Sequence, residues 1–135
     1  MSRSAIYVTN TTAQTLVANS TINPGVVQRR FGCNLNLSGN AISLQGSGYY
    51  KLNSSISLAP TAASTPITIS LYKDNVLVPG AIATTSVTTA GNVTNVNIVA
   101  LIRENCCCGD SMSNLTFVIS GAATVSNIAT VVEKL

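Results

Sequence analysis

Residues 50–58 read YKLNSSISL, and one set of side chains recurs there at every second position: Tyr50, Leu52, Ser54, Ile56 and Leu58. Successive side chains of a β-strand point to opposite faces, so a period of two indicates a strand with one buried face. Glycines at positions 46 and 48 precede this stretch and Pro60 follows it. Because proline cannot donate to a strand ladder, we expect the strand to stop at Pro60.

The same alternation returns along the rest of the chain. Further apolar–polar segments occupy residues 35–37, 42–44, 67–71, 76–78, 82–89, 96–102, 115–119 and 128–132. Turn-forming residues lie between several of them, namely Ser38-Gly39-Asn40, Lys73-Asp74-Asn75 and Pro79-Gly80. No window of helical length carries a clean apolar stripe. About eight to ten short strands predict an all-β, antiparallel jelly-roll sandwich that forms a single domain.

The alternation also predicts which segments and side chains build this domain. We expect residues 31–135 to form the jelly roll, and the less regular residues 1–30 to form an N-terminal arm or edge strands. Tyr49 and Tyr50 should face opposite sides of their strand, so they are not expected to form a shared ligand platform. The predicted core includes Leu52, Ile56, Ile69, Leu71, Ile98, Phe117 and Ile119.

The composition indicates a neutral polar surface. Charged residues make up 8% of the 135-residue chain, apolar residues 46% and aromatic residues 4%. Weak repulsion between copies then favours close packing of chains. The net charge of +3 is scattered, with Arg29-Arg30 as the only basic pair, so nucleic acid is not an expected partner. The sequence has no apolar run of membrane-spanning length and no secretory signal, so we expect cytosolic synthesis followed by assembly onto a particle.

Three segments resemble a known family. Gly48-Tyr49-Tyr50-Lys51-Leu52 resembles the GxYxxS opening of a central strand in complement-type globular heads, and residues 70–76 (SLYKDNV) resemble their LyKNG hairpin. Residues 96–102, Gly109-Asp110 and residues 115–118 resemble their late strand, GD turn and next strand. Tumour necrosis factor-like jelly rolls share this plan, as do the heads of exosporium collagen-like glycoproteins. Similar small proteins rich in Thr and Asn occur among bacteriophage head-decoration and fibre proteins.

The resemblance covers roughly residues 40–135 and implies a jelly roll that forms homotrimers. This sequence departs from the family in three ways: it lacks most of the buried aromatic residues of the animal heads, residues 1–135 contain no collagen repeat, and its cysteine cluster has no counterpart. Receptor-binding and calcium-binding roles are therefore not carried over.

Residues suited to catalysis are scarce. The chain has no histidine, which removes the commonest general base and a common zinc ligand. Its acids are not spaced as a catalytic pair, and they are Asp74, Glu104, Asp110 and Glu133. We therefore expect a protein without enzymatic activity and without a cofactor.

The cysteines form the unusual cluster in this sequence. Cys106, Cys107 and Cys108 are consecutive in a predicted turn, and Cys33 lies far from them in the chain. Three alternatives remain open: unmodified thiols, disulfides within or between chains, and thiolate ligands of a metal. We expect a structural or cross-linking role, with no catalytic and no metal-binding residue. A catalytic thiol needs a lowered pKa, and no histidine is present to lower it.

Three functions fit these observations. The leading hypothesis is a homotrimeric decoration protein or fibre head on the surface of a bacteriophage-like virion. The second is a spore-surface or appendage subunit stabilised by cysteine cross-links. The third is a carbohydrate- or receptor-binding head.

Overall fold

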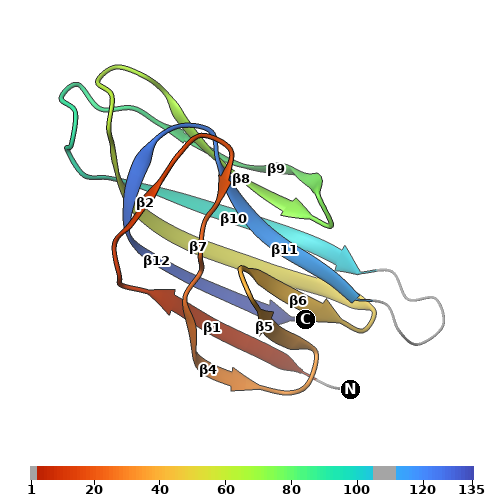
Figure 1. Cartoon of the computed structure of the whole chain (residues 1–135). Coiled ribbons are helices and arrows are strands. Elements are labelled where there is room, and N and C mark those ends of the chain that lie inside the picture. Colours follow the sequence, from red (N-terminus) through yellow and green to blue (C-terminus); the bar gives the residue numbers. More distant parts are fainter. Residues whose placement is uncertain (1–2, 105–111) are drawn as a thin grey trace.

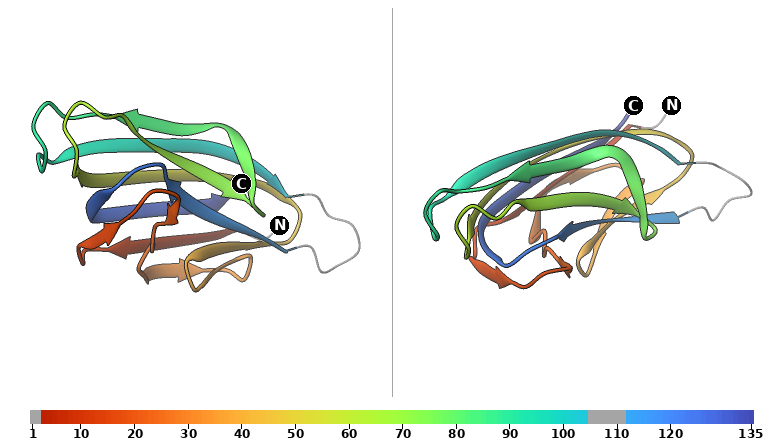
Figure 2. Two further views of the ribbon diagram at one scale, coloured as in Figure 1. Left: turned by 45° about the horizontal axis from the view of Figure 1, so that its top comes forward. Right: turned by 90° about the horizontal axis from the view of Figure 1, so that it is seen from above.

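The structure, a computed structural model, describes residues 3–104 and 112–135. These residues form two antiparallel sheets that pack face to face (Figures 1 and 2). Sheet 1 has the strand order β10 (Thr94–Glu104), β7 (Gly48–Pro60), β12 (Ala123–Lys134), β1 (Ser4–Asn10) and β4 (Val26–Phe31), and β2 (Gln14–Leu16) pairs with β12. Sheet 2 has the order β5 (Leu35–Ser38), β6 (Ala41–Gln45), β11 (Met112–Ile119), β8 (Ile67–Lys73) and β9 (Val76–Thr85), and β3 (Ser20–Thr21) pairs with β11. The predicted all-β jelly-roll sandwich is confirmed.

Strand β7 organises sheet 1, because it pairs with β10 on one side and with β12 on the other along most of its length. Its period-two pattern appears as alternating burial, and Pro60 is its last residue, as predicted. Tyr50 is fully buried and Tyr49 is about half exposed, which confirms that the two rings face opposite sides.

The core lies between the two sheets. All seven predicted core residues are buried, and they come from β7, β8, β10 and β11. Strands β1 and β12 add Ile6, Val8, Ile128 and Val132, which are also buried. Removing this much apolar surface from water is the main stabilising contribution to such a sandwich.

The N-terminal residues are more regular than the sequence pattern suggested. Strand β1 lies inside sheet 1, between β12 and β4, and buries Ile6 and Val8. Strand β4 is the edge strand of that sheet, and all six of its residues are exposed. Residues 4–10 are therefore an integral part of the sandwich, and residues 26–31 form its edge strand, within a region for which the sequence predicted an arm or edge strands over residues 1–30. With β1 to β4 included, the described residues form twelve strands.

The hairpin after β8 also differs from expectation. The sequence pattern placed a turn at Pro79-Gly80 and a separate strand over residues 82–89. Strand β9 instead continues from Val76 through Pro79 to Thr85. Because β9 is an edge strand of sheet 2, one side of its backbone has no ladder to complete, and proline is tolerated there.

Candidate functional site

The outer face of sheet 1 carries a band of exposed apolar side chains. Val99 of β10 and Leu101, two residues later, are each 60% exposed. The strand register places Val99 beside Asn53, Asn53 beside Val131, and Val131 beside Tyr7. An apolar row interrupted by one neutral amide therefore crosses four strands.

Few charges interrupt this band. Lys51 and Glu133 are cross-strand neighbours of opposite charge in the next row, beside Leu101. Together with Asn53, Ser55, Ala129 and Val131, they line a shallow hollow of about 330 Å³ in the middle of the face. A partner surface placed here would desolvate this adjacent pair of opposite charges, and at the end of the row it would meet Arg29, the cross-strand neighbour of Tyr7 on β4.

The end of this face near Asn95 is polar but neutral. The side-chain amide of Asn95 donates to the Ser55 hydroxyl at 3.2 Å and to the Ser57 hydroxyl at 3.0 Å. These bonds give the side-chain N–H donors of Asn95 acceptors within the same chain. The cost of removing this part of the face from water is therefore smaller than for unpaired groups.

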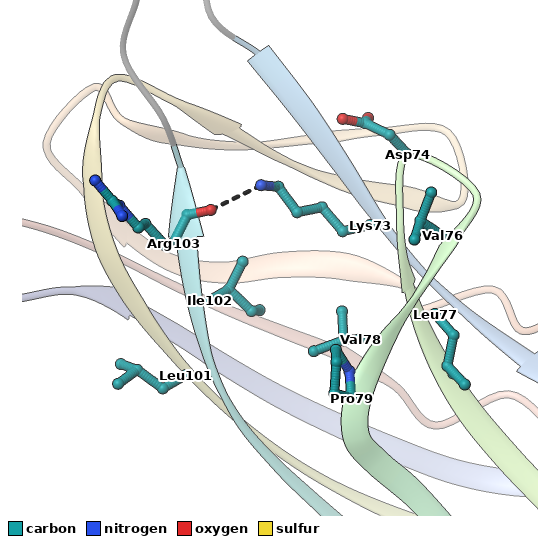
Figure 3. A pocket seen from close by; sticks show the side chains of 9 residues that line it. All are labelled: Lys73, Asp74, Val76, Leu77, Val78, Pro79, Leu101, Ile102 and Arg103. Atoms are coloured by element: carbon teal, nitrogen blue, oxygen red, sulfur yellow. Dashed lines mark hydrogen bonds between the residues drawn. The ribbon is translucent and has the colours of Figure 1, made fainter.

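A groove separates the edge strands β9 and β10, where one side of the sandwich is open (Figure 3). Its volume is about 430 Å³, and its lining is mainly apolar, from Val76, Leu77, Val78, Pro79, Leu101 and Ile102. Leu101 also belongs to the exposed band of sheet 1. The groove and the outer face of sheet 1 therefore meet along β10.

Lys73 closes one end of this groove. Its ammonium donates to the carbonyl oxygen of Arg103 at 2.7 Å (Figure 3). The same ammonium lies 3.6 Å from a carboxylate oxygen of Glu104. The Arg103 guanidinium in turn lies 6.0 Å from the centre of the Tyr49 ring. These contacts link the end of β8 to the end of β10.

Glu104 and Tyr50 are both buried polar residues near this end of sheet 1. Glu104 is only 5% exposed, and its Oε2 has no hydrogen-bond partner among the described residues. The Tyr50 hydroxyl donates to the carbonyl oxygens of Gln45 and Gly46, at 3.0 and 2.8 Å. Burial raises the pKa of Tyr50, with smaller coulombic contributions from Glu104 and Cys33. The sequence pattern identified Glu104 only as one of four acids and did not predict its ion pair with Lys73.

The other residues singled out from the sequence occupy separate places. Asp74 lies in the β8–β9 turn, where its carboxylate accepts a hydrogen bond from the backbone N–H of Asn114 at 2.9 Å. Glu133 lies on the outer face of sheet 1, and Cys33 is exposed between β4 and β5. Arg30 donates to the carbonyl oxygen of Leu35 at 2.7 Å, which ties β4 to β5. Asp110, Cys106, Cys107 and Cys108 lie outside the described residues.

The described part of the chain has neither a metal-binding cluster nor a membrane-spanning helix. No group of three or more His, Cys, Asp or Glu side chains is placed there to hold a metal ion. Residues 3–104 and 112–135 also include no helix long and apolar enough to cross a membrane.

Comparison with known proteins identifies the fold. No family model and no curated sequence matches the chain. Among solved structures, murine APRIL superposes with a TM-score of 0.73 at 13% identity, over 99% of this chain and 100% of APRIL. Eiger TNF from S. frugiperda gives 0.70 at 9% identity, over 98% and 91%. PRD1 vertex protein P5 gives 0.64 at 16% identity, over 97% and 95%. The chain therefore has the tumour necrosis factor-like jelly-roll fold that the sequence motifs suggested.

Proposed function

We propose that this jelly roll is a structural protein without enzymatic activity that assembles as a homotrimer on the surface of a bacteriophage-like virion, as a decoration protein or fibre head. The observation that carries the proposal is the exposed apolar band on the outer face of sheet 1, around Val99 and Leu101. Similarity in fold to a vertex protein of PRD1 supports a location on a virion. The usual trimeric state of TNF-like folds supports assembly as a homotrimer.

The band and the groove favour a ring-shaped oligomer. The outer face of sheet 1 spans five strands, whereas the β9–β10 side is an edge of the sandwich. If the edge of one subunit packs on the face of the next, the contact joins two different surfaces. Such a head-to-tail contact closes into a ring when the rotation between subunits allows it. Leu101, which borders both surfaces, would be buried at the centre of each contact.

The low charge of the outer face of sheet 1 favours association of subunits. A standard interface buries about 800 Å² on each partner, and burying apolar area stabilises by roughly 25 cal/mol per Å². Charged groups that lose water without a partner oppose this gain. The outer face of sheet 1 presents mainly Val, Leu, Tyr, Asn and Ser, so this opposing cost is small.

Light scattering on the purified protein tests the oligomer. We expect a mass three times the 13.9 kDa of one chain. Val99→Asp should shift the protein to monomers, because a carboxylate would be buried without a partner. The matched control is Val17→Asp, because Val17 is 67% exposed in the loop between β2 and β3 and lies outside both surfaces. Monomeric wild-type protein, or a trimer that survives Val99→Asp, would contradict the proposed assembly.

A second candidate function remains a spore-surface or appendage subunit stabilised by cysteine cross-links. The exposed thiol of Cys33 favours it, because a cross-link between subunits needs an accessible sulfur atom. Electrophoresis with and without reductant distinguishes the two. Covalent oligomers that Cys33→Ser abolishes would favour the cross-linked coat.

A further inference from the structure

The outer face of sheet 2 has a second kind of concavity, which is neutral and lined by amides and hydroxyls. It has a volume of about 230 Å³ and lies over β5, β6 and the start of β11. We call it the amide hollow, and the side chains that define it are Asn34, Asn36, Ser38, Ser43, Gln45 and Asn114. Cys33 also lines it, and no Lys, Arg, Asp or Glu among the described residues does.

Hydrogen bonds within the chain hold these side chains in place. The hydroxyl of Ser43, which is only 5% exposed, donates to the side-chain oxygen of Asn114 at 2.8 Å. The Asn34 side-chain nitrogen donates to the Gln45 carbonyl oxygen at 2.7 Å, and its side-chain oxygen accepts from the Ser4 hydroxyl at 2.8 Å. Polar groups fixed in this way bind a ligand without first losing conformational freedom.

Asn114 is held on its backbone side as well. Its N–H donates to the Asp74 carboxylate and its carbonyl oxygen accepts from the Asp74 N–H, both at 2.9 Å. The Ser43 hydroxyl bonds to the side-chain oxygen of Asn114. The side-chain nitrogen of Asn114 carries two N–H donors, and no hydrogen bond among the described residues uses them. Asn114 therefore presents fixed donors at the edge of the hollow.

A second hollow of about 260 Å³ adjoins the first at Asn114. It is lined by Ala41, Asp74, Asn75, Asn114 and Thr116. Thr116 is the cross-strand neighbour of Tyr72, whose half-buried ring adds an aromatic surface to the same face. The two hollows together form an elongated polar site with one aromatic side chain nearby.

From this arrangement we infer that the paired hollows bind a neutral carbohydrate of about two sugar units, with Asn114 between the units. A sugar presents hydroxyl groups that both donate and accept hydrogen bonds. Side-chain amides and hydroxyls also do both, and the Asp74 carboxylate of the second hollow adds an acceptor. The lack of a cation in the lining disfavours phosphate or an acidic peptide.

The location of the site fits an exposed attachment role. It lies on the outer face of sheet 2, on the opposite side of the sandwich from the band proposed to join subunits. Assembly through sheet 1 would leave it open to solvent. The inference goes beyond the proposed function and does not require a trimer, because the six side chains of the amide hollow all come from one chain.

Saturation-transfer NMR tests the inference on the full chain. The probes are four neutral disaccharides (lactose, maltose, cellobiose and chitobiose), with inorganic phosphate as the anionic comparison. We expect transfer to at least one disaccharide at millimolar concentration and none to phosphate. Asn114→Ala and Asn36→Ala should each weaken binding by about three- to tenfold, because each removes one hydrogen-bonding group.

The matched control is Asn92→Ala, which removes an exposed amide from the loop between β9 and β10, outside both the apolar band and the hollows. Loss of binding in at least one of the two hollow variants, with normal thermal unfolding and an unaffected Asn92→Ala, supports the site. Four results overturn it: no transfer to any disaccharide, a preference for phosphate, affinities unchanged in both hollow variants, or an equal loss in Asn92→Ala. Light scattering on the same samples reports the oligomer separately, so failure of one proposal leaves the other to be judged by its own data.

Discussion

The inner faces of the two sheets are both buried, but they differ in how many polar side chains they bury. The central strands of sheet 2 contribute mainly apolar side chains, among them Ile69, Leu71, Phe117 and Ile119. Sheet 1 contributes a similar apolar set and also buries Ser54, Thr130, the ring of Tyr50 and Glu104. Apolar side chains need only volume around them, whereas each buried polar group needs a partner of its own. The stability of sheet 2 should therefore depend mainly on packing, and that of sheet 1 also on specific pairs.

The buried pair at the centre of sheet 1 illustrates the difference. The hydroxyls of Ser54 and Thr130 are 3.0 Å apart on neighbouring strands, and both residues are fully buried. Their row also includes Ile98 and Val8, so the pair is surrounded by apolar neighbours. Each hydroxyl satisfies the other, which lets two polar groups lie in an otherwise apolar layer.

The largest expected effect tests the packing of sheet 2. Phe117→Ala should lower the free energy of unfolding by about 3–5 kcal/mol, because it leaves a cavity where a large aromatic side chain was buried. Chemical denaturation measures this change. Thr116→Ala, one residue earlier on the same strand, is the control and should change stability by less than about 0.5 kcal/mol. Similar values for the two variants would mean that Phe117 does not pack in a tight core.

A smaller effect is expected from the polar pair of sheet 1. Thr130→Val keeps the side-chain volume but leaves the Ser54 hydroxyl buried without its partner, at a cost of about 1–3 kcal/mol. Replacing both hydroxyls, as Ser54→Ala with Thr130→Val, should cost less than the sum of the single changes, because no polar group then remains unpaired. A double-mutant cycle by urea unfolding measures the coupling. Strict additivity would show that the two hydroxyls do not interact.

The smallest expected effect concerns Tyr50, and it depends on pH. Tyr50→Phe should cost about 0.5–1.5 kcal/mol at neutral pH, because the hydrogen bonds to Gln45 and Gly46 are lost. The pKa of Tyr50 is raised in the folded protein, so the unfolded chain gives up this proton at lower pH than the folded one. The stability that Tyr50 contributes is thus present below about pH 10 and is lost as the pH rises above it.

Denaturation between neutral and strongly alkaline pH measures this dependence. The wild-type protein should lose more stability over that range than Tyr50→Phe does. Tyr49→Phe is the control, because Tyr49 is about half exposed on the opposite side of the same strand. Equal alkaline losses in wild type and Tyr50→Phe would show that the buried phenol is not the cause.

The alternation of apolar and polar residues along each segment was sufficient to predict most of the fold. A period of two tells which side chains of a strand share a face, and it correctly placed Tyr50, Ser54 and Phe117 on the buried side. It worked less well before residue 31, where β2 and β3 are short and β4 is fully exposed and lacks an apolar face, and where the buried side of β1 was not predicted. It also failed at Pro79, because whether a strand lies at an edge is decided by its neighbours rather than by its own sequence.

The sequence by itself therefore determined the fold class, the core and the shortage of charges on the surface, because these depend on residue type and on spacing along one strand. Only the tertiary structure decided which side chains meet. The pairs Ser54–Thr130, Lys73–Glu104 and Ser43–Asn114 join residues 76, 31 and 71 positions apart, and strand order and register bring them together. The same holds for the apolar band and the amide hollow, since each is assembled from several strands whose alignment no single segment encodes.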